Sequence, residues 1–177
     1  MLLSDALEKF RGIELKMSEV YLWCSINFAD IELRQFFNDM SDQELAHART
    51  LDAAARANQG RPMEIDVPGT LADQEERKLD AMIAFVKTGP GLDATFAKIA
   101  EMESSEINLV GDSVCRADLG QTTRDNMCTN TRYHINMLKK AVENFPVSEH
   151  VKRRVQGIQV HDQVYYKVSP VKPAGHT

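Results

Sequence analysis

The chain has 177 residues, of which 43% are hydrophobic, and its formal net charge is −5. This length and hydrophobic content suit one domain with a sizeable core and exclude an intrinsically disordered chain. The negative charge argues against a nucleic-acid-binding protein, because such proteins carry a basic patch and the run Lys152-Arg153-Arg154 is too short to supply one.

The cysteines indicate a reducing environment. Their number is odd and no Cys-x-x-Cys occurs, so we interpret Cys24, Cys115 and Cys128 as small buried residues and not as a disulfide framework. The N-terminus becomes polar within a few residues, which predicts no signal peptide, and no apolar run reaches the length of a membrane span. We therefore expect a cytoplasmic protein with no membrane partner.

Residues 4–27 are predicted to form an amphipathic helix with Ser4 as its N-cap. The apolar stripe of this helix consists of Leu7, Phe10, Ile13, Met17, Tyr21, Cys24 and Phe28. Glu14 is in line with the stripe, and a charged group that faces a core is costly unless it is paired or bound to a metal. The alternative is that Glu14 stands at the edge of the stripe and reaches water.

The second predicted helix, residues 31–58, carries the pair Glu44 and His47 on its apolar side. Side chains three residues apart lie one above the other on a helix, so this pair could hold one metal ion. Such pairs also occur on solvated helices, and the pair alone is weak support. The position midway between Glu14 and Glu44 falls in the turn before this helix. An antiparallel hairpin would therefore place the two carboxylates at the same height.

A long crossover is predicted after the second helix. Residues 58–69 contain two glycines and two prolines and form a connector, and a shorter helix over residues 70–87 follows. The Gly-Pro-Gly sequence at residues 89–91 then ends that helix. A crossover of this length lets the next hairpin start at the same end as the second helix did.

A second hairpin with the same pattern is predicted after the crossover. Its first helix has Glu103 on the apolar stripe and Glu106 one turn away, beside the stripe. Its second helix, residues 122–144, has either His134 or Ile135 facing inward. The midpoint between Glu103 and the position three residues before His134 again falls in a predicted turn. The second hairpin therefore repeats the first.

The chain is expected to divide into a helical domain, residues 1–145, and a C-terminal extension, residues 146–177. Pro146 ends the fourth long helix. Residues 155–168 alternate loosely between apolar and polar, which favours an extended segment that packs along the helices or across a dimer. Residues 169–177 are predicted to be a loose tail.

The carboxylates and histidines of the two hairpins are expected to converge. The residues that would meet at one level of the interior are Glu14, Glu44, His47, Glu103, Glu106 and His134. Four carboxylates and two imidazoles cannot be buried together without positive charge, and a pair of divalent ions supplies it. A site rich in oxygen with one nitrogen for each ion suits iron or manganese better than zinc.

These residues resemble those of the rubrerythrins, within the ferritin-like carboxylate proteins. The features that carry the resemblance are Glu14 followed seven residues later by Tyr21; Glu44, His47 and Ala48 after the aromatic pair Phe36-Phe37; Ile-Ala-Glu-Met-Glu-Ser-Ser-Glu, which contains Glu103 and Glu106; and Tyr-His-Ile-Asn-Met-Leu, which contains His134. The resemblance covers about residues 4–145.

The resemblance implies an all-α fold, a ferritin-like antiparallel four-helix bundle with a long helical crossover. It also implies a di-iron centre that reduces peroxide or oxidises ferrous iron, with peroxide or oxygen as the oxidant. Glu44 would bridge the two ions, His47 and His134 would cap them, and Glu14 and Glu103 would complete their ligand shells. Tyr21 is expected to have a redox or hydrogen-bonding role as a catalytic residue, or to be part of the core. A homodimer or a larger homo-oligomer is also expected.

Two departures from the family pattern leave alternatives open. Thr131 stands where the family has a second bridging glutamate, so Glu106 could compensate, or the site could hold one ion, or zinc. No four-cysteine rubredoxin-type module is present, so an electron donor would be a separate protein. The alternative to an oxidoreductase is a non-enzymatic protein of the same fold that binds or stores iron with a degenerate site. A third possibility is a helical interaction protein whose buried carboxylates are coincidental.

Overall fold

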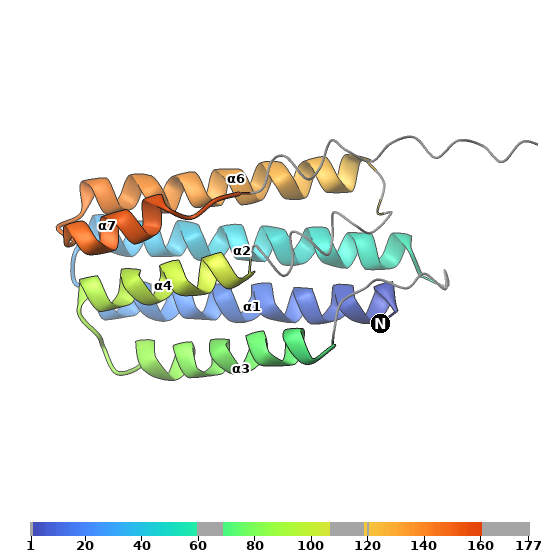
Figure 1. The fold of residues 1–177 in the computed structure, drawn as a ribbon, viewed down its shortest axis with the longest axis horizontal. Coiled ribbons are helices and arrows are strands. Elements are labelled where there is room, and N and C mark those ends of the chain that lie inside the picture. Colours follow the sequence, from blue (N-terminus) through green and yellow to red (C-terminus); the bar gives the residue numbers. More distant parts are fainter. Residues whose placement is uncertain (1, 60–68, 107–118, 120, 161–177) are drawn as a thin grey trace, which may run out of the picture.

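The computed structural model describes residues 2–59, 69–106, 119 and 121–160, and these residues form an all-helical structure (Figure 1). The helices are α1 (Leu3–Asn27), α2 (Ile31–Ala57), α3 (Gly69–Val86), α4 (Leu92–Glu106), α6 (Gln121–Asn144) and α7 (Glu149–Gln156). The described part of the chain contains no β-strand. The predicted all-α class is therefore confirmed.

Helices α1 and α2 form an antiparallel hairpin joined by residues 28–30 (Figure 1). The Asp30 carboxylate accepts a hydrogen bond from the backbone N–H of Leu33 at 2.8 Å, so Asp30 is the N-cap of α2. The predicted cap of α1 is wrong: Leu2 occupies the N-cap position without a side-chain bond, and the Ser4 hydroxyl donates to Asp5. The short loop and the apolar faces of the two helices together fix the hairpin.

Helix α3 runs back along α1, toward the end of the molecule where α2 begins, and α4 starts from that end (Figure 1). Contacts between α1 and α3 recur every seven residues: Lys9 bonds Asp73, Lys16 bonds Asp80 at 2.7 Å, and the Lys87 ammonium lies 4.9 Å from the ring centre of Trp23. A seven-residue repeat keeps the same faces of two neighbouring helices in contact, as in coiled coils. The two helices are therefore parallel and in one register.

Helix α7 packs against α4 and α6 and was not predicted from the sequence. Its buried residues are Val151 and Val155, and the backbone N–H of Ser148, at its N-cap position, donates to the Asp93 carboxylate at 2.8 Å. Residues 149–156 of the expected extension are thus helical. The rest of the segment expected to be extended lies largely outside the described residues.

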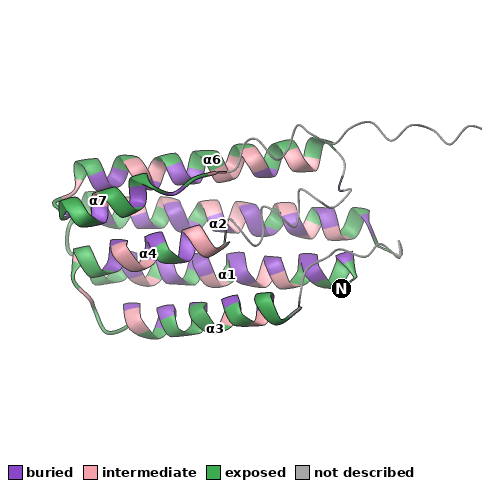
Figure 2. Ribbon diagram, in the orientation of Figure 1, coloured by how far each residue is buried: buried purple, intermediate pink, exposed green. Residues whose placement is uncertain are grey.

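The core lies where the helix faces meet, and the exposed residues cover the outside (Figure 2). Its largest fully buried side chains include Tyr21, Phe10, Phe37 and Phe96. Full burial of one such side chain stabilises the folded state by about 1.5–3 kcal/mol. Among the described helices, none is both long and apolar enough to cross a membrane.

Candidate metal centre

Acidic and histidine side chains from α1, α2, α4 and α6 meet inside the molecule. They are Glu14, Glu44, His47, Glu103 and His134, and none of them is more than 6% exposed. Each stands at a core-facing position of its helix, where the helical repeat would otherwise place an apolar residue. The sequence predicted that these residues would converge, and the structure brings them together. Their role as metal ligands stays a prediction.

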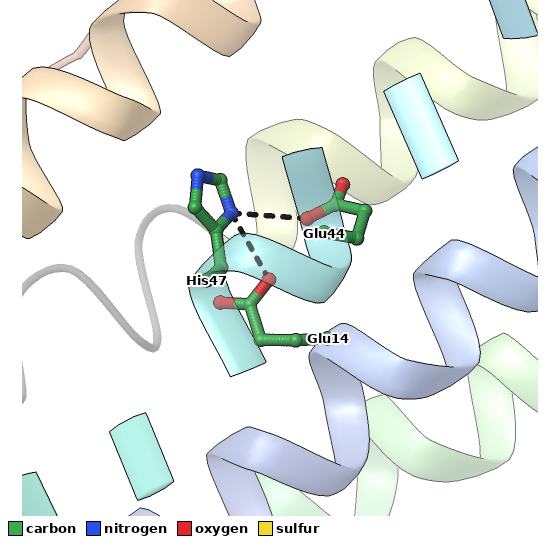
Figure 3. A group of neighbouring side chains, drawn as sticks. All are labelled: Glu14, Glu44 and His47. Atoms are coloured by element: carbon green, nitrogen blue, oxygen red, sulfur yellow. Dashed lines mark hydrogen bonds and ion pairs between the residues drawn. The ribbon is translucent and has the colours of Figure 1, made fainter. Parts of the chain in front are cut away.

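The first half of the centre is built by α1 and α2 (Figure 3). His47 Nδ1 lies 3.2 Å from Glu14 Oε2 and 3.0 Å from Glu44 Oε2. Glu44 and His47 are three residues apart on one helix, and Glu14 approaches from the neighbouring helix of the hairpin. Their ligand atoms lie within 4.8 Å of one another, so this group could hold a metal ion.

The second half is built by α4 and α6 around the same Glu44. His134 Nε2 lies 2.9 Å from Glu103 Oε1 and 3.3 Å from Glu44 Oε1. The Tyr21 hydroxyl donates a hydrogen bond to Glu103 Oε1 and lies 3.5 Å from His134 Nε2. The ligand atoms of Glu44, Glu103 and His134 also lie within 4.8 Å of one another, so this group too could hold a metal ion.

Glu44 belongs to both halves, with one carboxylate oxygen facing each imidazole. Oε2 faces His47 and Oε1 faces His134, and the two imidazole ring centres are 5.6 Å apart. A carboxylate in this position can bind one ion through each oxygen. If each group held a cation, this position would allow Glu44 to bridge the two ions.

The centre concentrates negative charge in a poorly solvated interior. The pKa of Glu44 is raised well above its ordinary value of 4.5, first by burial and then by the charges of Glu14 and Glu103. The ion pairs of Glu44 and Glu103 are with histidines, which are positive only when protonated. Buried like charges are costly without a compensating charge, and a divalent cation bound in each group would provide it. The donor set of carboxylate oxygens and imidazole nitrogens fits iron, manganese or zinc.

Two of the residues singled out in the sequence are not placed in the centre. Glu106 is the last residue of α4, and its side chain lies outside the described part of the structure. Thr131 is half-buried, one turn before His134 on α6. Position 131 therefore provides no second bridging carboxylate. Compensation by Glu106 stays a prediction, because that side chain is not among those described.

One buried carboxylate escaped the sequence analysis. Glu75, on α3, is 3% exposed, and its Oε2 accepts hydrogen bonds from Lys78 at 2.9 Å and from the Ser105 hydroxyl at 2.8 Å. The bond from Ser105, on α4, joins α4 to α3, whereas the Lys78 bond lies within α3. The signal was present in the sequence, because Glu75 occupies a stripe position between Ala72 and Leu79.

Comparisons with protein-family models, with curated proteins and with solved structures found no match to this chain.

Proposed function

We propose that this protein is a rubrerythrin-like, non-haem di-iron oxidoreductase that reduces peroxide or oxidises ferrous iron. The observation that carries the proposal is the position of Glu44 between two buried groups, each with one further glutamate and one histidine. A single metal site needs only one such group. Two groups that share a carboxylate favour a pair of ions.

The arrangement of the helices supports the same proposal. In this proposal α1, α2, α4 and α6, which carry the five buried acidic and histidine side chains, are the four helices of a ferritin-like bundle, and α3 belongs to its crossover. In that fold family, ligand residues project inward from all four helices, with a Glu-x-x-His pair on a core-facing stripe. Glu44 and His47 have this spacing, whereas α6 has Thr131 at the corresponding position before His134.

Two iron ions, each changing by one electron, would supply the two electrons that reduce one peroxide to two water molecules. In this proposal Glu44 would bridge the ions, His47 and His134 would bind one ion each, and Glu14 and Glu103 would balance their charge. The Tyr21 hydroxyl donates its proton in a hydrogen bond to Glu103 Oε1, a member of the second group. Burial of all these side chains excludes bulk water, which strengthens their electrostatic interactions with a bound cation.

A protein of the same fold that binds or stores iron without turnover is the second candidate. Thr131 favours it, because a hydroxyl does not bridge two cations as a carboxylate does. The two candidates differ in kinetics. An oxidoreductase consumes many equivalents of peroxide for each chain when a reductant is present, whereas a storage protein oxidises or binds iron in proportion to its amount.

Metal analysis of protein from iron-supplemented cells tests both candidates. We expect the double variant Glu44→Ala/His47→Ala to lose bound iron while its helical circular dichroism remains. The matched control is Glu149→Ala/His150→Ala, which removes the same residue types from the exposed face of α7. Unchanged iron in the first variant, or equal loss in both, would refute the ligand assignment.

A further inference from the structure

A row of aromatic rings leads away from the candidate metal centre. It starts at Tyr21, whose ring centre is 5.8 Å from that of His134 and 6.3 Å from that of Phe37. Phe37 lies 5.7 Å from Phe96 and 5.1 Å from Phe36. Successive rings are therefore in contact range of one another, from α1 through α2 to α4.

The row ends near the surface, at Phe145. This half-buried ring is 6.0 Å from Phe36 and 6.5 Å from Phe96, and it directly follows α6. Aromatic side chains fill cores wherever they fit, so packing alone explains most such rings. The two ends of the row distinguish it from ordinary packing. Tyr21 donates a hydrogen bond to the Glu103 carboxylate at one end, and Phe145 is only half-buried at the other.

Positive charge gathers on the helix that follows Phe145. Helix α7 carries three basic side chains and one acidic side chain, in a chain whose formal net charge is −5. Arg153 and Arg154 are exposed and form no ion pair with any described residue, whereas Lys152 pairs with Glu149 at 3.2 Å. Val151 and Val155 of α7 are buried where it packs on α4 and α6, whereas Arg153 and Arg154 are exposed.

We propose that the exposed arginines of α7 dock an acidic one-electron carrier protein and that the aromatic row carries its electrons inward. This inference rests on the proposed function. The ligand residues are buried, so a donor protein cannot touch them, and electron transfer through packed groups is faster than across a solvent gap. Each encounter oxidises the carrier by one electron. Two encounters provide the two electrons that, with two protons, convert one peroxide to two water molecules.

Complementary charge explains how such a carrier would find this end of the molecule. The protein and an acidic partner repel each other over most of their surfaces, because both are negative. A local positive patch guides association to one place and makes the rate sensitive to salt. Exposed charges at the edge of an interface act mainly on the association rate of the two proteins, and through that rate on the Kd.

The docking test uses the full-length protein without added iron and a plant-type [2Fe–2S] ferredoxin, a small acidic one-electron carrier. We expect binding by calorimetry at low ionic strength, and Arg153→Glu/Arg154→Glu to raise the Kd about tenfold. The matched control is Arg49→Glu/Arg77→Glu, which makes the same charge change at exposed positions on α2 and α3. The control should leave the Kd within about twofold of the wild-type value.

Several results would overturn the inference. Absence of ferredoxin binding does so, as does equal weakening by the α7 variant and its control. A second measurement tests binding to an RNA oligonucleotide. If the wild type binds RNA, and the α7 variant loses that binding while its Kd for ferredoxin is unchanged, the arginines serve a different partner. Because docking is measured without added iron, it can fail while iron binding persists. Failure of the proposed function would instead appear as absence of iron in the metal analysis.

The aromatic row has its own test on iron-loaded protein. Phe37→Leu keeps a large apolar side chain but removes the ring that joins Tyr21 to Phe36 and Phe96. We expect slower single-turnover oxidation of reduced ferredoxin with the Kd unchanged. The control is Phe10→Leu, which changes a fully buried ring that is not in ring contact with the row in the described part of the structure. An equal decrease in the two variants would show that the row has only a packing role.

Discussion

Glu44 Oε1 lies 3.3 Å from His134 Nε2, although the two residues come from α2 and α6 and are 90 positions apart in the sequence. The other oxygen of Glu44 lies 3.0 Å from His47 Nδ1. One carboxylate thus contacts both imidazoles of the centre. Glu14 and Glu103 each belong to only one of the two groups. The three buried glutamates of the centre should therefore differ in how much metal binding depends on them.

The first prediction compares Glu44→Gln with Glu14→Gln. Each change removes one negative charge and keeps the shape of the side chain. We expect Glu44→Gln to lower iron content in both groups and Glu14→Gln to lower it in one, because only Glu44 is shared. Elemental analysis at saturating ferrous iron measures this. The shared role is refuted if Glu44→Gln retains as much iron as Glu14→Gln.

The second prediction concerns the pH dependence of the metal-free protein. The raised pKa of Glu44 means that the folded state holds its proton at pH values where the unfolded state has released it. The free energy of unfolding should therefore fall as pH rises from the ordinary value of about 4.5 through the raised pKa. Glu44→Gln removes this titration, so its urea-denaturation stability should fall less over the same pH range. Parallel pH profiles for the two proteins would contradict the prediction.

The third prediction concerns the Tyr21 hydroxyl. Tyr21→Phe keeps the buried ring and removes the donor to Glu103. We expect the free energy of unfolding to decrease by about 1 kcal/mol, the net value of one hydrogen bond. Iron should remain bound, while the rate of peroxide consumption should fall if the hydroxyl is catalytic. The control is Tyr133→Phe, since Tyr133 is 57% exposed. If Tyr21→Phe lowers the stability but leaves the rate of peroxide consumption unchanged, the role of Tyr21 is only structural.

The fourth prediction separates packing from charge in the attachment of α3. Met82 is fully buried, whereas the Lys16–Asp80 pair is largely exposed. We expect Met82→Ala to cost about 2–5 kcal/mol of stability, through lost burial and the cavity left behind. Asp80→Ala should leave the thermal midpoint nearly unchanged, because water and salt screen an exposed pair. Equal decreases in thermal midpoint for the two variants would contradict this ordering.

Much of the centre could be predicted from the sequence because helical periodicity determines which residues face inward. Glu14, Glu44 and Glu103 stand at core positions, and the lengths of the hairpins bring them to one level. Periodicity also marks Glu75 as a core position, but its hydrogen bond with Ser105 depends on where α3 lies against α4. Periodicity within one helix does not give that contact.

The details of the site depend on side-chain conformations that the sequence does not determine. The sharing of Glu44, one oxygen toward each histidine, requires the packing of α2 against α6. The hydrogen bond from Tyr21 to Glu103 joins α1 to α4 across the interior. Helix α7 was missed because it is short and charged, and its few apolar residues are buried only against α4 and α6.

The last prediction concerns Thr131. In the full rubrerythrin pattern a glutamate stands three residues before the second histidine and provides another bridging carboxylate. Here Thr131 supplies no such carboxylate on the helix that carries His134, so a cation beside that histidine would have one anionic ligand fewer than in the full pattern and would be less well compensated. We therefore expect the group of Glu14 and His47 to bind iron more tightly. The variant Thr131→Glu should raise the iron content toward two ions for each chain and speed ferrous oxidation.

The control for Thr131→Glu is Thr131→Val, which has a similar size to threonine and adds no carboxylate. It should leave the iron content unchanged. Glu106→Ala should lower iron binding more in the wild type than in the Thr131→Glu variant, if Glu106 supplies the missing ligand. Equal iron content in the wild type and in Thr131→Glu at saturating iron would mean that the second group is already complete. In that case the asymmetry inferred from Thr131 would be wrong, and an acidic group other than the new glutamate would have to balance the second ion.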